Sequence, residues 1–133
     1  MKHFRKIDEI LLGSAFLAAA ALVVPLAGVR AAGDHEAGAD VFDTYCSDCH
    51  SVSPKGTNRK GPSLYGVLGR RAATVRGFEY SPAMVHSGIV WSPQALNAYI
   101  ANPQAVVPNG KMKKGLPKPS DRANLIEYLA NPD

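Results

Sequence analysis

Two cysteines and a histidine lie within five consecutive residues, Cys46-Ser47-Asp48-Cys49-His50. Two thiols separated by two residues and followed directly by an imidazole form the pattern that attaches a c-type haem covalently. The thiols add across the two vinyl groups of the porphyrin, and the histidine can then bind the iron from one face. We therefore expect one haem c, attached through Cys46 and Cys49 and ligated by His50.

Other kinds of site use the same residue types. A thioredoxin-like Cys-x-x-Cys follows a strand, whereas residues 37–45 have helical spacing. A zinc site needs four ligands, and the chain has no further cysteine and only three histidines outside the motif. A disulfide between Cys46 and Cys49 would close a very small, strained loop and leave His50 without a role. The haem site explains all three residues, and these alternatives do not.

The N-terminal segment has the pattern of an export signal. Three basic residues precede an uncharged stretch over residues 10–29, as in a secretory signal peptide. We expect cleavage after Ala31, or after Gly28 as a second choice, which makes residues 1–31 the signal peptide and residues 32–133 the domain. At about 1.5 Å per residue the stretch could also span a bilayer, so an uncleaved membrane anchor is the alternative. Both fates predict a periplasmic protein, either released or held at the inner membrane.

The charge of the chain is modest once this segment is set aside. The formal net charge is +4, but residues 32–133 hold 11 Lys and Arg against 9 Asp and Glu, a difference of +2. Acidic residues gather near the start of this domain and basic residues in its later loops. The basic residues are scattered among Gly and Pro without interleaved aromatic residues, so we expect no nucleic-acid partner.

The motif must be positioned by helices and long loops. Helical spacing of apolar residues predicts a first helix over residues 37–49. The many Gly and Pro over residues 51–77 predict loops. Ser81-Pro82 and Ser92-Pro93 each place a capping hydroxyl before a proline, which predicts two short helices. The first of these should end at Gly88.

The C-terminal part completes an all-α pattern. The second short helix should end at Asn102-Pro103, because proline stops a helix. A loop over residues 104–119 follows, and Ser120 should cap a last helix with an apolar face. The chain thus predicts one loop-rich, all-α domain without repeats, and a buried haem would supply apolar mass to its small core.

The residue opposite His50 decides what the haem can do. Met112 lies in the flexible loop before the last helix, where its thioether could be placed over the ring, and we expect it to be the sixth ligand. Met84 falls inside a short helix and is interpreted as a packing residue. His86 would give a bis-histidine site, and His35 lies close to the export signal. Both histidines remain alternatives to Met112.

From Gly38 to Leu129 the chain resembles the class I c-type cytochromes, and more closely the group of mitochondrial cytochrome c and bacterial cytochrome c2. The segment from Gly61 to Arg70 is similar to the family's Gly-Pro-x-Leu-x-Gly segment. In that family the first and last helices pack through four residues, which match Gly38, Phe42, Leu125 and Tyr128. The resemblance implies a cytochrome c-like fold, with few helices wrapped around one haem.

The resemblance also implies roles in the haem pocket. The Pro62 carbonyl would accept a hydrogen bond from Nδ1 of His50, and Tyr99 would lie near the Met112 sulfur. The residues that would hydrogen-bond and neutralise the haem propionates are Arg70, Tyr80 and Trp91. The chain departs from the family pattern at Gly110, where a hydroxyl-bearing residue is usual, and at Tyr65, where histidine is frequent. It also has Lys113-Lys114 in place of an apolar and an aromatic residue.

A haem with two protein ligands has no open position for a substrate. We therefore expect a monomeric, non-enzymatic one-electron carrier. Its donor would be a quinol-oxidising complex, and its acceptor a terminal oxidase, a reductase or a photosynthetic reaction centre. Transient docking would use the basic residues near the haem edge, Lys60, Lys111, Lys113 and Lys114. The alternatives are a haem subunit of a larger redox enzyme, or a small peroxidase with a labile sixth ligand.

Overall fold

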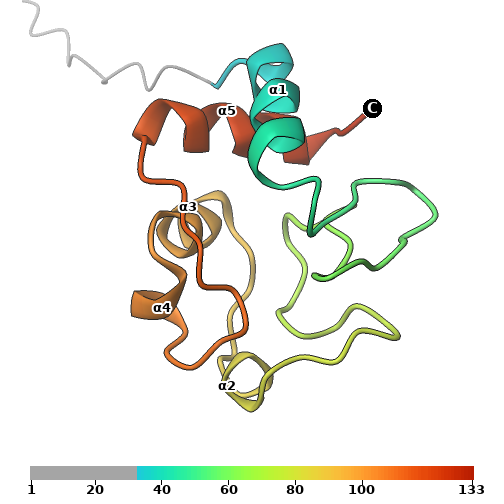
Figure 1. Ribbon diagram of the computed structural model, residues 1–133, viewed down its shortest axis with the longest axis vertical. Coiled ribbons are helices and arrows are strands. Elements are labelled where there is room, and N and C mark those ends of the chain that lie inside the picture. The colour runs from blue at the N-terminus through green and yellow to red at the C-terminus, as the bar shows by residue number, and fades with distance from the viewer. Residues whose placement is uncertain (1–32) are drawn as a thin grey trace, which may run out of the picture.

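Five helices and several long loops make up residues 33–133, the part of the chain that a computed structural model describes (Figure 1). The helices are α1 (His35–Tyr45), α2 (Pro82–Val85), α3 (Pro93–Ala101), α4 (Pro103–Val106) and α5 (Pro119–Ala130). The extended pairing found in these residues is one isolated antiparallel bridge between Arg71 and Val90. The predicted all-α, loop-rich fold is confirmed. The predicted export signal lies outside the described residues, and none of the helices described is long and apolar enough to cross a membrane.

Helix α1 begins and ends earlier than predicted. The Asp34 carboxylate caps it by accepting a hydrogen bond of 2.8 Å from the Ala37 amide. The helix ends at Tyr45 rather than at Cys49. The backbone amides of Cys49 and His50 then donate to the Cys46 carbonyl at 3.0 and 2.9 Å. The haem-binding motif is therefore a tight turn at the end of α1, and apolar spacing alone does not distinguish such a turn from another turn of helix.

The starts of α2 and α3 confirm the capping predictions. The Ser81 hydroxyl accepts from the Met84 amide at 3.2 Å, and the Ser92 hydroxyl accepts from the Ala95 amide at 3.1 Å. Each serine is followed by a proline at the first helical position, where the missing N–H costs nothing. Helix α2 ends at Val85, slightly before the predicted Gly88.

Two predictions for the C-terminal part were wrong in detail. Residues 103–106 form helix α4 instead of loop, because Asn102 ends α3 and also caps α4 through a 3.2 Å hydrogen bond from the Ala105 amide. Ser120 does not cap α5. The N-cap is Lys118, which makes no side-chain capping bond, and Pro119 is the first helical residue. An Asn-Pro pair can thus start a helix as well as stop one.

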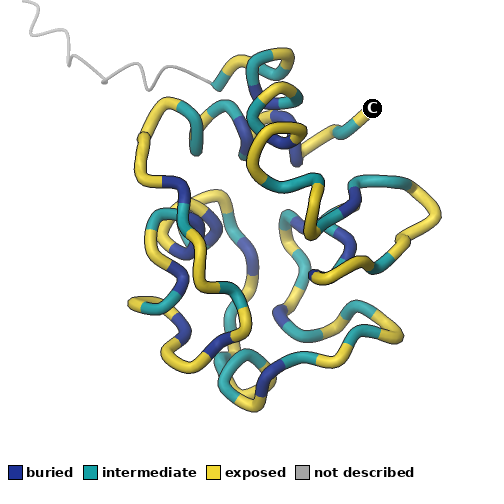
Figure 2. The backbone as a smooth tube through the Cα atoms, in the orientation of Figure 1, coloured by how far each residue is buried: buried dark blue, intermediate teal, exposed yellow. Residues whose placement is uncertain are grey.

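The core is built where α1 crosses α5. Gly38 lies so close to α5 that a Cβ atom on it would come within 2.1 Å of the Asn124 carbonyl oxygen. One turn later the Phe42 ring lies 5.8 Å from the Tyr128 ring. Figure 1 shows these two helices together at one end, with α3, α4 and the loops beyond them. Figure 2 shows that buried residues also occur in the long loop over residues 51–77, and two of them, Val67 and Ala72, belong to the same core cluster as Phe42.

Candidate haem site

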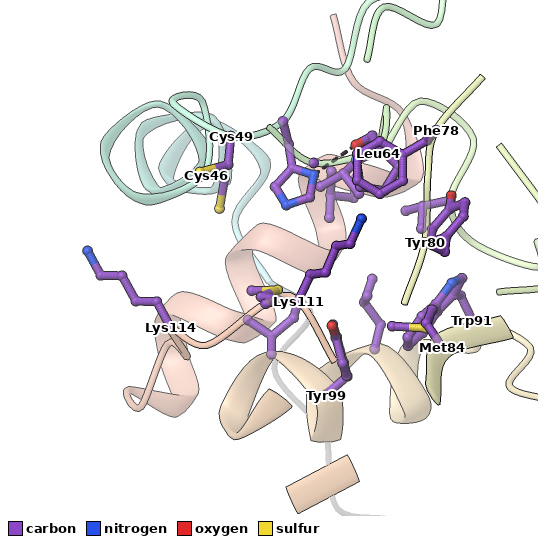
Figure 3. Close-up of a pocket in the computed structure, with 18 of the residues that line it drawn as sticks. Cys46, Cys49, Leu64, Phe78, Tyr80, Met84, Trp91, Tyr99, Lys111 and Lys114 are labelled. Carbon is purple, nitrogen blue, oxygen red and sulfur yellow. Dashed lines mark hydrogen bonds between the residues drawn. The ribbon is translucent and has the colours of Figure 1, made fainter. Parts of the chain in front are cut away.

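A cavity of about 460 Å³ lies between the turn after α1, the long loops, and helices α3 and α5 (Figure 3). This volume is within the range of roughly 300–1,000 Å³ for pockets that hold cofactors. Its lining is mainly apolar, and it includes both cysteines and the histidine of the motif. Both methionines of the described residues, Met84 and Met112, also line it. The apolar interior thus faces both cysteines, His50 and two methionines.

The two cysteines lie at one edge of the cavity, as Figure 3 shows. Both are free thiols; Cys46 is half-buried and Cys49 is exposed. Burial and, to a lesser extent, the nearby Cys49 raise the pKa of Cys46 to about 11, while the positive charge of Lys114 opposes both effects. The disulfide alternative is not what the structure contains, and each thiol remains available for a thioether bond.

His50 is held in a single orientation. Its Nδ1 lies 2.8 Å from the Pro62 carbonyl oxygen. A carbonyl can only accept, so Nδ1 carries the hydrogen and Nε2 keeps a free lone pair. Burial lowers the pKa of His50, although the hydrogen bond to Pro62 opposes this. The histidine therefore presents a neutral, oriented nitrogen donor of the kind that iron binds.

Gly61 supports the flat side of this ring. A Cβ atom placed on Gly61 would lie 2.3 Å from Cε1 of His50 and 2.7 Å from Nδ1. Only glycine leaves room for the imidazole at this position. The sequence pattern singled out the Gly-Pro pair, but it gave no sign that the glycine touches the ring.

The other two histidines in residues 33–133 are placed away from the cavity. His86 is exposed at the end of α2, with its Nδ1 2.8 Å from the Pro82 carbonyl oxygen. His35 contacts the Tyr128 ring and the Asn131 carbonyl. Among the described residues, His50 is the only histidine that lines the cavity. The geometry leaves methionine as the candidate for the opposite side.

All five predicted pocket residues border the cavity: Pro62, Arg70, Tyr80, Trp91 and Tyr99. The Arg70 guanidinium donates two hydrogen bonds of 2.8 Å, to the Ser63 and Tyr65 carbonyls. These bonds fix its position and leave further N–H groups unused.

The aromatic side chains among these pocket residues are held in position by contacts with their neighbours. The Tyr80 hydroxyl accepts from the Val75 amide at 3.3 Å, and the Trp91 and Tyr99 rings are 5.1 Å apart. Figure 3 shows Tyr99 rising from α3 with its hydroxyl toward the cavity. The structure thus collects side chains from distant parts of the chain around one apolar space.

Phe78 is a cavity residue that the sequence did not predict. Its ring packs edge-on against Tyr80 at 4.8 Å, and the Lys111 ammonium lies 5.8 Å from its centre. Phe78 lies in an irregular loop, where no periodic pattern marks a buried face. The one feature of the sequence that could have indicated its role is its position two residues before Tyr80.

The four lysines predicted for docking border the cavity and are exposed. Lys111 donates to the Glu79 carbonyl at 2.5 Å and lies 3.7 Å from its carboxylate. Lys113 donates to the Gln104 side-chain oxygen at 3.1 Å. Lys60 and Lys114 form no ion pair within the part of the chain described. The basic residues at this edge therefore differ in how firmly they are held.

These residues fit a covalently attached haem. The cavity is apolar, it presents two free thiols at one edge and a neutral imidazole nitrogen, and it brings a guanidinium and a tyrosine hydroxyl to its border. The polar groups suit propionates, and the donor set suits iron. The arrangement defines a c-type haem protein.

Comparison with known proteins agrees with this class. The family model of cytochrome c matches residues 35–132. The chain is 48% identical over 98 residues to cytochrome c2 of Rhodopila globiformis, and the aligned residues make up 73% of this chain and 92% of the relative. It is 43% identical over 98 residues to cytochrome c type-1 of Ascaris suum, covering 73% of this chain and 87% of the relative.

A longer relative is the cytochrome c-type cyt cy of Rhodobacter capsulatus. The identity is 47% over 98 residues, covering 73% of this chain but 48% of the relative.

The chain described here belongs to the cytochrome c family. It is a haem electron carrier with one haem c attached through Cys46 and Cys49, as the motif predicted.

Proposed function

We propose that this protein carries single electrons with a His/Met-ligated haem, in which Met112 binds the iron opposite His50. The observation that supports this best is the shared cavity. It contains the free Nε2 of an oriented His50 and the side chain of Met112, and the other histidines described lie elsewhere. When bound, the haem supplies a reversible one-electron Fe(III)/Fe(II) couple.

The residues around the cavity set the conditions for that couple. A thioether is a soft ligand that favours the reduced state, and an apolar surrounding disfavours the extra charge of the oxidised state. Pro62 and Gly61 hold the imidazole in place. We assign Arg70, Tyr80 and Trp91 to the propionates and Tyr99 to the neighbourhood of the Met112 sulfur. These roles predict a positive reduction potential and no open ligand position for a substrate.

The physiological partners are proposed from the same features. A quinol-oxidising complex would donate electrons, and a terminal oxidase, reductase or reaction centre would accept them. The exposed lysines at the cavity edge would steer a monomer to acidic docking faces, and such contacts are weak and salt-dependent. Residues 1–31 would direct the domain of residues 32–133 to the periplasm, either as a cleaved signal or as a membrane anchor.

The visible spectrum of the ferric holoprotein tests the ligand assignment. Iron bonded to a methionine sulfur gives a weak absorption at about 700 nm. We expect this band in the native protein and in Met84→Ala, and we expect its loss in Met112→Ala. Met84→Ala is the matched control, because both methionines line the cavity.

Two results would contradict the proposal. A band that survives in Met112→Ala and disappears in Met84→Ala would move the ligand to α2. A native protein with bound haem and no band would have another ligand set. Rapid binding of carbon monoxide by such a reduced protein would favour the haem-subunit or peroxidase alternative.

A further inference from the structure

The chain around Met112 has few main-chain supports. The Gly110 amide donates to the Val107 carbonyl at 3.0 Å, and the Leu116 amide donates to the Ile100 carbonyl at 2.8 Å. Between these two bonds, residues 111–115 form no main-chain to main-chain hydrogen bond with any described residue. The position of Met112 therefore depends on side chains that reach this segment.

The side chain of Gln104 supports the main chain at Met112 itself. Its Nε2 donates to the Met112 carbonyl at 2.7 Å and to the Gly110 carbonyl at 3.1 Å. Its Oε1 accepts from the Lys113 ammonium at 3.1 Å. An ammonium can only donate and a carbonyl can only accept, so these neighbours fix the orientation of the amide. One half-buried side chain thus binds three of four consecutive residues, 110, 112 and 113.

The backbone of Gln104 is itself well anchored. It is the second residue of α4, where Pro103 is fully buried and the Val107 amide donates to the Pro103 carbonyl at 2.8 Å. The Asn102 side chain caps the same helix. The amide of Gln104 therefore connects a fixed helix to a loop that lacks supports of its own.

We propose that Gln104 is a positioning residue that keeps Met112 over the cavity and so determines how often the sixth position opens. The inference rests on the proposed ligation by Met112. Without the two hydrogen bonds that Gln104 donates, the loop moves Met112 away from the cavity more often. A small external ligand that needs the open position then binds more tightly, because its apparent affinity scales with the open fraction.

The chain contains a matched control for this residue. Gln94 is the second residue of α3 and follows the same order of cap, proline and glutamine that precedes Gln104. Gln94 is exposed, and its side chain forms no hydrogen bond with the described residues. A substitution there removes the same chemical group from the same position of a helix without touching the Met112 loop.

The test is a titration of the ferric holoprotein with imidazole, followed by the visible spectrum. We expect Gln104→Leu to bind imidazole roughly 5- to 100-fold more tightly than the native protein, the factor that corresponds to two lost hydrogen bonds of ordinary strength. Gln104→Glu should act in the same direction, because a carboxylate cannot donate to the two carbonyls. Gln94→Leu should bind imidazole as the native protein does.

Three outcomes would overturn the inference. Imidazole affinity in Gln104→Leu within about twofold of the native value would mean that the bonds do not hold the loop. An equal gain in Gln94→Leu would show a general loss of stability instead. If the native protein lacks the band near 700 nm, or keeps it in Met112→Ala, the ligand assignment fails and the inference fails with it. If that band behaves as expected while Gln104→Leu is unchanged, the inference alone fails.

Discussion

At the scale of single residues, the haem site depends on one contiguous motif and on contacts that only the fold creates. Cys46, Cys49 and His50 could be predicted because their chemistry requires that they be neighbours in the chain. The contact between Gly61 and the His50 ring could not, because a glycine in a loop has many possible reasons to be there. The same holds for Gln104, whose bonds to the Met112 loop follow from the unpredicted helix α4.

The close contact between Gly61 and the His50 ring predicts a specific effect of Gly61→Ala. The added methyl would lie 2.3 Å from Cε1 of His50, so the ring or the loop must shift. We expect a destabilisation of about 1–3 kcal/mol, typical of overpacking, together with a changed visible spectrum and reduction potential. Guanidinium unfolding and redox titration of the holoprotein measure these effects.

Gly66→Ala separates strain in the backbone from contact with the ring. Gly66 has a positive φ of 63°, and a Cβ atom there would meet nothing within 4 Å. Alanine should therefore cost roughly 1–2 kcal/mol from its backbone conformation alone and leave the spectrum unchanged. Equal spectral changes in the two variants would argue against a supporting role for Gly61.

At the scale of elements, capping chemistry predicted helix starts better than apolar spacing predicted helix ends. The Ser-Pro pairs before α2 and α3 behave as expected, because a hydroxyl and a proline suit the first turn wherever they occur. The end of α1 was misplaced, since the residues of the haem motif continue its pattern in a turn. α4 is too short for a periodic signal, and its cap is shared with the end of α3.

The crossing of α1 and α5 predicts the effect of Gly38→Ala. The new methyl would lie 2.1 Å from the Asn124 carbonyl oxygen and 2.7 Å from Cβ of Tyr128, and neither can move without shifting a helix. We expect a loss of at least about 1–3 kcal/mol in the free energy of unfolding. Asp40→Ala, at an exposed position of the same helix, should remain within about 0.5 kcal/mol of the native value. Chemical unfolding of the two holoproteins provides the comparison, and similar midpoints would show that the helices can separate slightly.

At the scale of the whole molecule, the distribution of charge matters more than its total. Lys60, Lys111, Lys113 and Lys114 border one cavity, although the domain carries a net charge of only +2. Two of these lysines are already engaged, Lys111 by Glu79 and Lys113 by Gln104. Lys60 and Lys114 are therefore the ones expected to respond most to an acidic partner.

Lys114→Gln should weaken adsorption to a carboxylate-coated electrode by about 1.5- to 5-fold at low ionic strength, as expected for one exposed charge pair. The difference should shrink at an ionic strength of about 0.15 M, where the Debye length is about 8 Å. Lys55→Gln removes the same charge from a loop that does not border the cavity, and it should have a smaller effect. Voltammetry of the adsorbed proteins measures both the binding and the electron-transfer rate. Equal effects of the two substitutions would mean that net charge, and not the cavity edge, controls docking.

The contact between the two ends of the domain also constrains when the chain can fold. The Asp34 amide donates to the Asn124 side chain at 2.9 Å, across 90 positions of sequence, and His35 reaches the Asn131 carbonyl across 96. Contacts at such separation close a long loop, so their formation costs loop-closure entropy. The packing of α1 against α5 must therefore wait until the last residues have been synthesised. Until then Cys46 and Cys49 directly follow a helix that still lacks its packing partner.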